Sequence, residues 1–390
     1  MNRRRVAVTG LGVVSSCGIG APAFWEGLHR PPTPGEVLRI DSFDPAPYFD
    51  NPKEVRRADR FQQFAAAAAQ EAVGQAGDFV RDASRVATMI GTGIGGLATI
   101  EEQSAVCRDR GPRRVSPFLI PMVMGNAPAA AISMRYGFQG PCESVATACA
   151  TGTHAIGNAA RLIMFDRCDA AVAGSTEAAI TETGVAGFRN MTALTSSGVS
   201  APFDAHRDGF VMSEGAAVVV LEEWEAARTR GATILAEVLG GASSADAHHI
   251  TAPAPKGAGA IGCMRLALQE AGLDPAEIAQ VNAHGTSTPR NDEAEALAIA
   301  SLFGYPGPPV TSIKGVTGHA LGAAGAIEAV AVVISMMERS IPPTLGYRTP
   351  DPDLPSIDIV TEPRVWTPGP TISNSFGFGG HNGCLVLAPS

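Results

Sequence analysis

The sequence is poor in charged residues and has no uninterrupted apolar run of the length that a membrane helix requires. Only 17% of its 390 residues are charged, and a membrane helix needs about 20 consecutive apolar residues. The apolar pattern Ala326–Met337 is interrupted by Glu328, and glycines interrupt Val6–Val14 before it reaches the length of a signal peptide. We therefore expect a cytoplasmic protein with no membrane partner.

The chain also lacks any Cys-x-x-Cys pair, and its seven cysteines are an odd number. This usage disfavours a disulfide framework and a zinc site, and it indicates free thiols in a reducing compartment. The formal net charge of -9 disfavours bulk binding of nucleic acid. Arginines cluster at Arg56, Arg57 and Arg60 and again at Arg113 and Arg114, and each cluster alone is interpreted as a solvated surface.

Hydrophobic residues make up 45% of the chain, which is enough for an extensive buried core. Short β-branched runs alternate with alanine-rich helical patterns, and this alternation predicts an α/β fold with mostly buried sheets. The predicted strands are Val6–Thr9, Val86–Ile90, Ala170–Ala173, Ala216–Leu221, Leu235–Leu239, Gln280–Ala283, Val310–Ser312 and Leu385–Leu387. The predicted helices are Phe61–Gln75, Thr153–Met164, Ile261–Ala271, Asp292–Leu302 and Gly322–Met337.

A short strand followed by a glycine loop and a serine pair occurs twice. The first copy begins at Arg5 and the second at Ile234, with the helical segment Glu223–Arg230 as a junction before the second. We therefore expect two similar halves, residues 1–230 and 231–390, with a site at their interface.

Two glycine-rich loops are similar to nucleotide-binding sequences without completing them. Gly91, Gly93 and Gly96 have the spacing G-x-G-x-x-G, but the acidic residue expected about 20 residues further on is absent. The loop from Gly10 to Gly12 is incomplete in the same way. We interpret both as tight turns that pass close to another element, which argues against a nicotinamide reductase.

The most informative segment is Glu143–His154, in which Cys149 lies between an apolar segment and a helical pattern. This arrangement predicts a strand, a sharp turn and a helix, with the thiol at the helix N-terminus. A helix N-terminus favours a thiolate and offers N–H groups that can hold an oxyanion. The alternative is a buried structural cysteine, which is the commoner role of a free cysteine.

Two histidines follow predicted strands in loops rich in glycine and threonine. His284 lies in the run from Asn282 to Thr288, and His319 lies between Ser312 and Gly322. Because α/β proteins build their sites in loops at the carboxyl ends of strands, these histidines together with Cys149 predict catalysis. Metal binding by the two histidines is an alternative, but no carboxylate lies at ligand spacing beside either, and we predict no metal.

A fourth motif, Asn374–Gly383, surrounds Phe376 and Phe378 with glycines before the last predicted strand. We expect a mobile loop whose backbone comes close to a ligand. The alternative is a glycine-rich turn with core phenylalanines, which fits Phe376 better than Phe378.

These four motifs, in this order, resemble the β-ketoacyl-(acyl carrier protein) synthases of the thiolase-fold condensing enzymes over essentially the whole chain. The nearest types are the elongating synthase II and the ketosynthase subunit of type II polyketide systems. The resemblance implies a five-layered αβαβα sandwich of two duplicated halves. It also implies a decarboxylative Claisen condensation of an enzyme-bound acyl chain with malonyl-acyl carrier protein, in fatty-acid or polyketide biosynthesis.

The resemblance further implies the catalytic roles. Cys149 would be the nucleophile that takes the acyl chain from the carrier protein. His284 and His319 would promote decarboxylation and stabilise the enolate. Lys314 with Glu328 would organise the histidine loop.

Substrate contacts are implied in the same way. The N–H groups of Cys149 and Phe378 would form the oxyanion hole. Thr286 and Thr288 would bind the phosphopantetheine arm, and Phe188 with Phe378 would gate the acyl pocket. No cofactor is expected, because the substrates are carried on the phosphopantetheine of acyl carrier protein.

Acyl carrier protein is thus the expected partner, together with a second subunit in a homodimer or in a heterodimer with a chain-length-factor-like homologue. Two alternatives share the fold. A thiolase would need a second catalytic cysteine, but Cys384 is expected within the last strand. A non-elongating chain-length-factor-like subunit typically lacks the active cysteine, and His319 argues against enzymes that start fatty acids.

Overall fold

Eleven strands form one mixed sheet in the computed structural model, which describes residues 3–390. Each predicted strand overlaps one of them: β1 (Val6–Ser15), β2 (Gly18–Ile19), β4 (Val86–Gly91), β5 (Cys142–Glu143), β6 (Ala170–Glu177), β8 (Gly215–Glu223), β9 (Ala236–Ala245), β10 (Gln280–Asn282), β11 (Val310–Thr311), β14 (Thr371–Gly377) and β15 (His381–Pro389). Two small sheets pair β3 (Val37–Leu38) with β7 (Met212–Ser213), and β12 (Ser340–Ile341) with β13 (Arg364–Val365).

The large sheet consists of two halves with the same strand order and the same strand directions. In the first half, β1, β8 and β6 are antiparallel neighbours, and β4 and β5 continue parallel to β6. In the second half, β9, β15 and β14 are antiparallel neighbours, and β10 and β11 continue parallel to β14. The halves meet where β1 pairs with β9. These are the two strands from which the sequence indicates a duplication, so the duplicated halves are confirmed, while the boundary at residue 230 stays a prediction.

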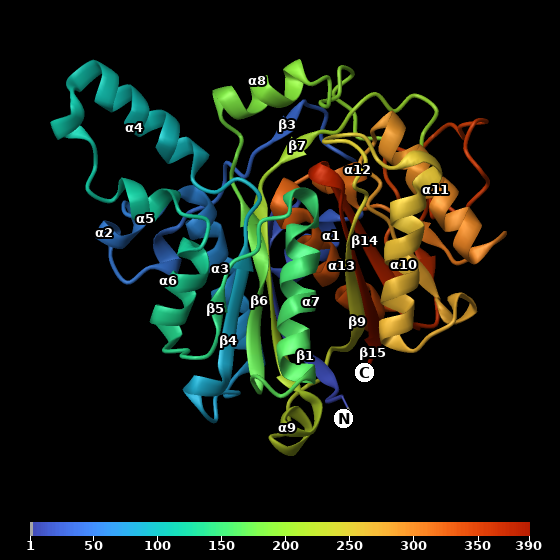
Figure 1. The fold of residues 1–390 in the computed structure, drawn as a ribbon, viewed down its shortest axis with the longest axis horizontal. Helices are drawn as coiled ribbons and strands as arrows, with labels where there is room; N and C mark the ends of the chain where they lie inside the picture. Colours follow the sequence, from blue (N-terminus) through green and yellow to red (C-terminus); the bar gives the residue numbers. More distant parts are fainter. Residues whose placement is uncertain (1–2) are drawn as a thin grey trace.

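Helices divide this arrangement into five layers (Figure 1). The helices are α1 (Ala21–Gly27), α2 (Pro52–Val55), α3 (Arg60–Ala76), α4 (Leu97–Arg110), α5 (Leu119–Val123), α6 (Ala127–Tyr136), α7 (Thr151–Met164), α8 (Glu182–Asn190), α9 (Trp224–Thr229), α10 (Ala258–Ala271), α11 (Pro289–Phe303), α12 (Lys314–Thr317) and α13 (Ala324–Glu338). Helices α3 and α6 cover the outer face of the first half-sheet, and α10 with α11 beside it covers the outer face of the second. Helices α7 and α13 lie between the half-sheets and contact both.

Three apolar cores fill the spaces between these layers. The middle core joins α7 and α13 to both half-sheets, and the outer cores lie under α3 and under α10. One segment, Leu321–Glu338, is long and apolar enough to cross a membrane, but 89% of it is buried inside the protein in this middle layer. Its hydropathy therefore fits a helix that packs on two sheets at once.

The sequence does not predict α4 and α8. Helix α4 buries only Thr99, and α8 buries no residue. Helix α4 has no apolar stripe and therefore carries no periodic signal in the sequence. Helix α8 has a short one, in which half-buried Val185 and Phe188 pack on an apolar cluster, but it spans only nine residues.

The two arginine clusters differ from the expected solvated surfaces in one respect. Arg60 forms an ion pair with the buried Glu214 at 2.7 Å, so it belongs to the interior network rather than to a surface patch. Arg57 lies over the Phe118 ring at 4.2 Å from its centroid, which brings the cluster at residues 56–57 beside the segment that follows residue 114.

Candidate active site

Cys149 lies in a single 3-10 turn, η4 (Ala148–Ala150), that leads directly into α7. Ala148 has a φ of 48°, a left-handed conformation that costs a residue with a side chain about 1–3 kcal/mol. The Thr151 hydroxyl closes the turn by donating to the Ala148 carbonyl at 2.7 Å and accepting from the Thr147 N–H at 2.8 Å. The predicted turn and helix are confirmed, but the predicted strand before them is only the exposed pair Cys142–Glu143, since the chain leaves the sheet edge there.

The end of β14 passes so close to this turn that residue 377 has no room for a side chain. A Cβ on Gly377 would lie 3.0 Å from the Cys149 backbone nitrogen and 3.0 Å from the Thr147 carbonyl oxygen. This approach brings the Phe378 N–H to the Cys149 sulfur, where it lowers the pKa of the thiol together with the N–H of Cys149 itself. The two N–H groups expected to form an oxyanion hole are thus brought to the same sulfur.

Burial decides the ionisation of this thiol. Cys149 is 8% exposed, and burial raises its pKa to about 11, although the Lys314 charge and the Phe378 N–H oppose the rise. Burial thus opposes the thiolate that the helix N-terminus favours, and whether the resting group is a thiolate stays a prediction. The thiol needs a base to become nucleophilic.

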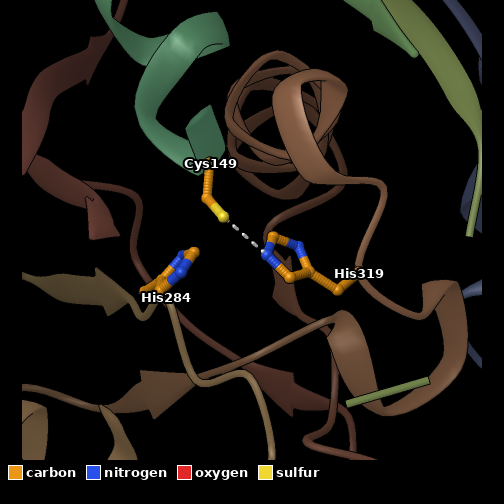
Figure 2. A group of neighbouring side chains, drawn as sticks. All are labelled: Cys149, His284 and His319. Atoms are coloured by element: carbon orange, nitrogen blue, oxygen red, sulfur yellow. Dashed lines mark hydrogen bonds between the residues drawn. The ribbon is translucent and has the colours of Figure 1, made fainter. Parts of the chain in front are cut away.

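His319 lies where such a base is needed. Its Nε2 is 3.0 Å from the Cys149 sulfur, and Figure 2 marks this contact with a dashed line. Its backbone N–H donates to the Val211 carbonyl at 2.7 Å, and its carbonyl accepts from the Ser213 N–H at 3.0 Å. Burial, reinforced by the Lys314 charge, holds the pKa of His319 well below its usual range. The imidazole is therefore neutral at pH 7 and able to accept a proton.

His284 follows β10, and its ring meets the His319 ring edge-on with centroids 5.3 Å apart. The Lys314 ammonium lies 3.3 Å from His284 Nδ1 and forms a buried ion pair with Glu328. Because an ammonium can only donate, it occupies the Nδ1 lone pair, and the neutral ring then carries its proton on Nε2. Burial, followed by the Lys314 charge, holds the pKa of His284 well below its usual range. His284 is therefore a neutral hydrogen-bond donor.

Two carboxylates that the sequence analysis does not single out hold the His284 loop. Glu295 accepts from the His284 N–H at 2.8 Å and from the Gly285 N–H at 2.7 Å. Asp292 accepts from the Thr286 N–H at 3.0 Å. Both acids lie on α11, and their spacing of three residues places them on one helix face, which is the signal that could have identified them.

Glu177 is a third carboxylate that the sequence analysis does not single out. It is the last residue of β6 and is fully buried. It accepts from the Gly93 N–H at 2.8 Å and from the Gly322 N–H at 3.1 Å. A Cβ on Gly93 would lie only 2.7 Å from the Glu177 carboxylate. The interpretation of the loop from Gly91 to Gly96 as a tight turn against another element is therefore confirmed. Gly10 and Gly12 also pass close to another element, α3, but they lie inside β1 and not in a turn, so that part of the interpretation is wrong.

A cavity of about 380 Å³ opens onto Cys149, His284 and His319. The four residues expected to contact substrate all line it: Phe188, Thr286, Thr288 and Phe378. The Thr286 and Thr288 hydroxyls lie 2.9 Å apart. The side chains of Lys314 and Glu328 lie behind His284 and are each no more than 2% exposed. This position is the one that residues organising His284 would need.

Most residues of the fourth motif, Asn374–Gly383, belong to the strands β14 and β15, so the mobile loop that the sequence predicts is short. β14 continues to Gly377 and β15 begins at His381, leaving only the turn η8 (Phe378–Gly380) between them. The Gly379 N–H donates to the Ile250 carbonyl at 2.7 Å, and the Gly380 carbonyl accepts from the Asp246 N–H at 2.9 Å. The glycines indicate a loop in the sequence, but the two strands pair almost to the turn and bury most of the motif.

The donor atoms of Cys149, His284 and His319 lie within 4.8 Å of one another, so a metal site has to be considered. The chemistry of the donors does not fit one. Nδ1 of His284 accepts from Lys314 and Nε2 carries the proton, so neither nitrogen offers a lone pair, and the ammonium adds a positive charge beside the site.

Cys384 lies within β15, as expected. Its thiol is 1% exposed and lies 3.3 Å from the Asn374 side-chain oxygen. It is therefore a core residue and not the second catalytic cysteine that a thiolase would need.

Comparison with known proteins agrees with this geometry. The chain matches the family models "Beta-ketoacyl synthase, N-terminal domain" over residues 29–227 and "Beta-ketoacyl synthase, C-terminal domain" over residues 235–348. It is 41% identical to the "3-oxoacyl-[acyl-carrier-protein] synthase 2" of Synechocystis sp., over 99% of this chain and 98% of that protein.

Two solved structures align with this chain over the full length of both proteins. One is "The ishigamide ketosynthase/chain length factor", at 32% identity and a TM-score of 0.92. The other is a type II PKS acyl-carrier protein in complex with its ketosynthase bound to the hexaketide, at 30% identity and a TM-score of 0.91. The chain therefore belongs to the β-ketoacyl synthase family and has the thiolase fold of its condensing enzymes.

Proposed function

We propose that this protein catalyses the decarboxylative Claisen condensation of a Cys149-bound acyl chain with malonyl-acyl carrier protein, giving β-ketoacyl-acyl carrier protein. The observation that carries the proposal is the contact of 3.0 Å between the Cys149 sulfur and His319 Nε2 at the inner end of the cavity. A nucleophile in hydrogen-bond reach of a neutral base is the arrangement that covalent acyl transfer requires.

In the first half-reaction, the Cys149 thiol passes its proton to His319 as the sulfur attacks the thioester carbonyl of the acyl carrier. The carbonyl oxygen gains negative charge, which we expect the N–H groups of Cys149 and Phe378 to bind, since both lie beside the attacking sulfur. Collapse of the tetrahedral intermediate breaks the bond to the phosphopantetheine sulfur, which takes the proton from His319. The acyl chain then remains on Cys149.

In the second half-reaction, the malonyl thioester binds with its carbonyl oxygen toward His284 and His319. Loss of carbon dioxide leaves the electron pair of the broken carbon–carbon bond in an enolate, and His284 Nε2–H donates to its oxygen. His319 donates a second hydrogen bond to the enolate oxygen when its own proton is on Nε2. Because both imidazoles are neutral, they stabilise the enolate without adding a fixed charge. The enolate carbon attacks the acyl carbonyl, the bond from that carbonyl to the Cys149 sulfur breaks, and the released thiolate takes from solvent the one proton that the reaction consumes.

The proposed reaction takes no resident cofactor. Its reactants are thioesters of phosphopantetheine, which acyl carrier protein would deliver. The similar type II PKS ketosynthase was solved in complex with its acyl-carrier protein, which supports this partner. All seven cysteines are free thiols. Because free thiols persist in a reducing compartment, we propose the cytoplasm as the location of the protein.

A second subunit is proposed at the open edge of the first half-sheet. Strand β5 ends this edge, and Cys142 and Glu143 are both exposed there. The neighbouring helices expose apolar side chains, which are Ile100, Ile120, Met124 and Met134. Uncovered strand edges and apolar patches of this kind mark protein interfaces. Light scattering on the purified chain separates a homodimer from a monomer that needs a chain-length-factor-like homologue.

The proposal is tested by intact-mass analysis after incubation with medium-chain acyl carrier protein and then with malonyl carrier protein. Wild type should gain one acyl group and then release β-ketoacyl product. Cys149→Ser should gain none, whereas Cys107→Ser, which changes an exposed thiol on α4, should behave as wild type. An adduct that persists in Cys149→Ser would refute the nucleophile, and acylation without elongation would favour a partner-dependent subunit.

A further inference from the structure

The cavity contains three charged side chains besides its histidines, and only one of them is free to bind a ligand. Asp208 accepts hydrogen bonds from Thr195–Ser197. Asp246 accepts from the Asn382 side chain at 2.7 Å. Arg290, in contrast, is exposed, and within residues 3–390 its guanidinium has no hydrogen bond or ion pair.

Arg290 lies at the mouth of the cavity, because it is exposed while Cys149 and His284 at the inner end are buried. It is the second residue of α11, and the N-terminal end of a helix of this length carries partial positive charge. The N-cap residue, Thr288, makes no capping hydrogen bond with its side chain. The mouth therefore presents an unpaired cation at the positive end of a helix.

Arg207, which contacts the first residue of the same helix, does not share this role. Arg207 donates to the Pro289 carbonyl at 3.3 Å, but it is paired with Asp351 at 2.5 Å. Its charge is therefore already neutralised, and Arg290 is the cation that the mouth offers to a ligand.

The substrate of the proposed reaction carries an anion at the matching place. In a phosphopantetheine thioester, the sulfur and the phosphate lie at opposite ends of the arm, so a thioester at Cys149 directs its phosphate toward the mouth. A planar guanidinium donates two parallel hydrogen bonds to phosphate oxygens. We propose that Arg290 binds the phosphate of the phosphopantetheine arm and thereby positions the thioester at Cys149, an inference that rests on the proposed function.

The direct test is calorimetric titration of the intact protein with phosphopantetheine and with pantetheine, which lacks only the phosphate. Wild type should bind phosphopantetheine more tightly. Arg290→Ala should lose about tenfold in affinity for phosphopantetheine and nothing for pantetheine, because one charge-assisted contact is removed. Arg290→Lys should retain part of the preference. The matched control is Arg265→Ala, which removes an exposed arginine on α10 outside the cavity lining and should change neither affinity.

Salt provides a second readout, since the preference for the phosphate should shrink at 0.5 M salt, where exposed charges are screened at about 4 Å. A wild type that binds both arms equally or neither, or an Arg290→Ala variant that keeps the phosphate preference, overturns the proposal. The titration needs no acyl transfer, so a protein that prefers the phosphate but is never acylated would refute the proposed function and not the site.

The phosphate could come from acyl carrier protein or from coenzyme A, which carry the same arm. Rates of Cys149 acylation from each donor separate these sources. If Arg290→Ala slows acylation only from the acyl carrier protein donor, the arm of the carrier protein is the ligand. If it slows acylation only from the coenzyme A donor, the coenzyme A thioester is the ligand. Equal rates of wild type and Arg290→Ala with both donors would count against a positioning role.

Discussion

The Cys149 sulfur and His319 Nε2 meet at 3.0 Å although the two residues lie 170 positions apart in the chain. Each stands just before a helix of the middle layer, Cys149 before α7 and His319 before α13. Because α7 and α13 pack against each other between the half-sheets, both groups are held by the most buried part of the protein. The nucleophile and its base are thus positioned by the interface of the duplicated halves.

His319 should be required for decarboxylation as well as for acyl transfer. We expect His319→Ala to slow release of carbon dioxide from malonyl carrier protein by about 100-fold, the effect typical of a lost proton donor or acceptor in the transition state. His29→Ala, which changes a histidine bonded to the Trp25 carbonyl, should leave the rate unchanged. Unchanged decarboxylation in His319→Ala would contradict its role.

The buried pair of Lys314 and Glu328 should matter for stability and activity in different ways. Lys314→Met leaves Glu328 buried without its partner, and we expect the free energy of unfolding to fall by about 3–5 kcal/mol. The double variant Lys314→Met with Glu328→Leu should recover most of this loss in a denaturant titration but stay inactive, because His284 loses the ammonium that fixes its proton on Nε2.

An exposed ion pair provides the comparison. Arg228 and Glu225 are 60% and 65% exposed at their side chains, and Arg228→Met should change the unfolding free energy by less than about 1 kcal/mol. A double variant of the buried pair that regains full decarboxylation would show that Lys314 does not act through His284.

The pH dependence of alkylation should report the burial of Cys149. Because the pKa of the thiol is raised to about 11, the neutral form dominates at pH 7 and the thiolate fraction grows as pH rises. The rate of modification by iodoacetamide should therefore rise about tenfold per pH unit between pH 7 and 10. Cys149→Ser identifies the contribution of the other thiols. A rate that is high and constant near pH 7 would instead indicate a resting thiolate paired with His319.

The turn η8 should move when Cys149 becomes acylated, because Phe378 lines the cavity beside the sulfur. Its anchors are the bonds of Gly379 and Gly380 to the segment 246–254, so we expect this segment to move with the turn. Crystal structures of free and acylated protein measure the change as loss of the bond from Gly379 to Ile250. Identical positions in both states would count against gating by Phe378.

Local patterns in the sequence predict the long buried elements and bring out the residues of the site. Period and composition identify the main strands and the longest buried helices, and the loop of His284 marks where a strand ends. Helix α4 escapes this reasoning because it has no apolar face, and α8 escapes because its apolar face, Val185 and Phe188, extends over less than two turns. β14 escapes because the glycines at its end are typical of a loop, although the strand pairs with β15 up to Gly377.

Sequence alone determined that Cys149 precedes a helix and that His284 follows a strand, because these properties depend on neighbouring residues. The expectation that His319 also follows a strand is wrong, since the short helix α12 lies between β11 and His319. Tertiary structure decided what those residues can do. Packing between the half-sheets removes water from Cys149 and raises the pKa of its thiol, so the thiol depends on His319. Distant segments also supply the Phe378 N–H and the carboxylates of Glu295 and Glu177. Desolvation and long-range hydrogen bonds arise only when remote parts of the chain pack together, so no local pattern records them.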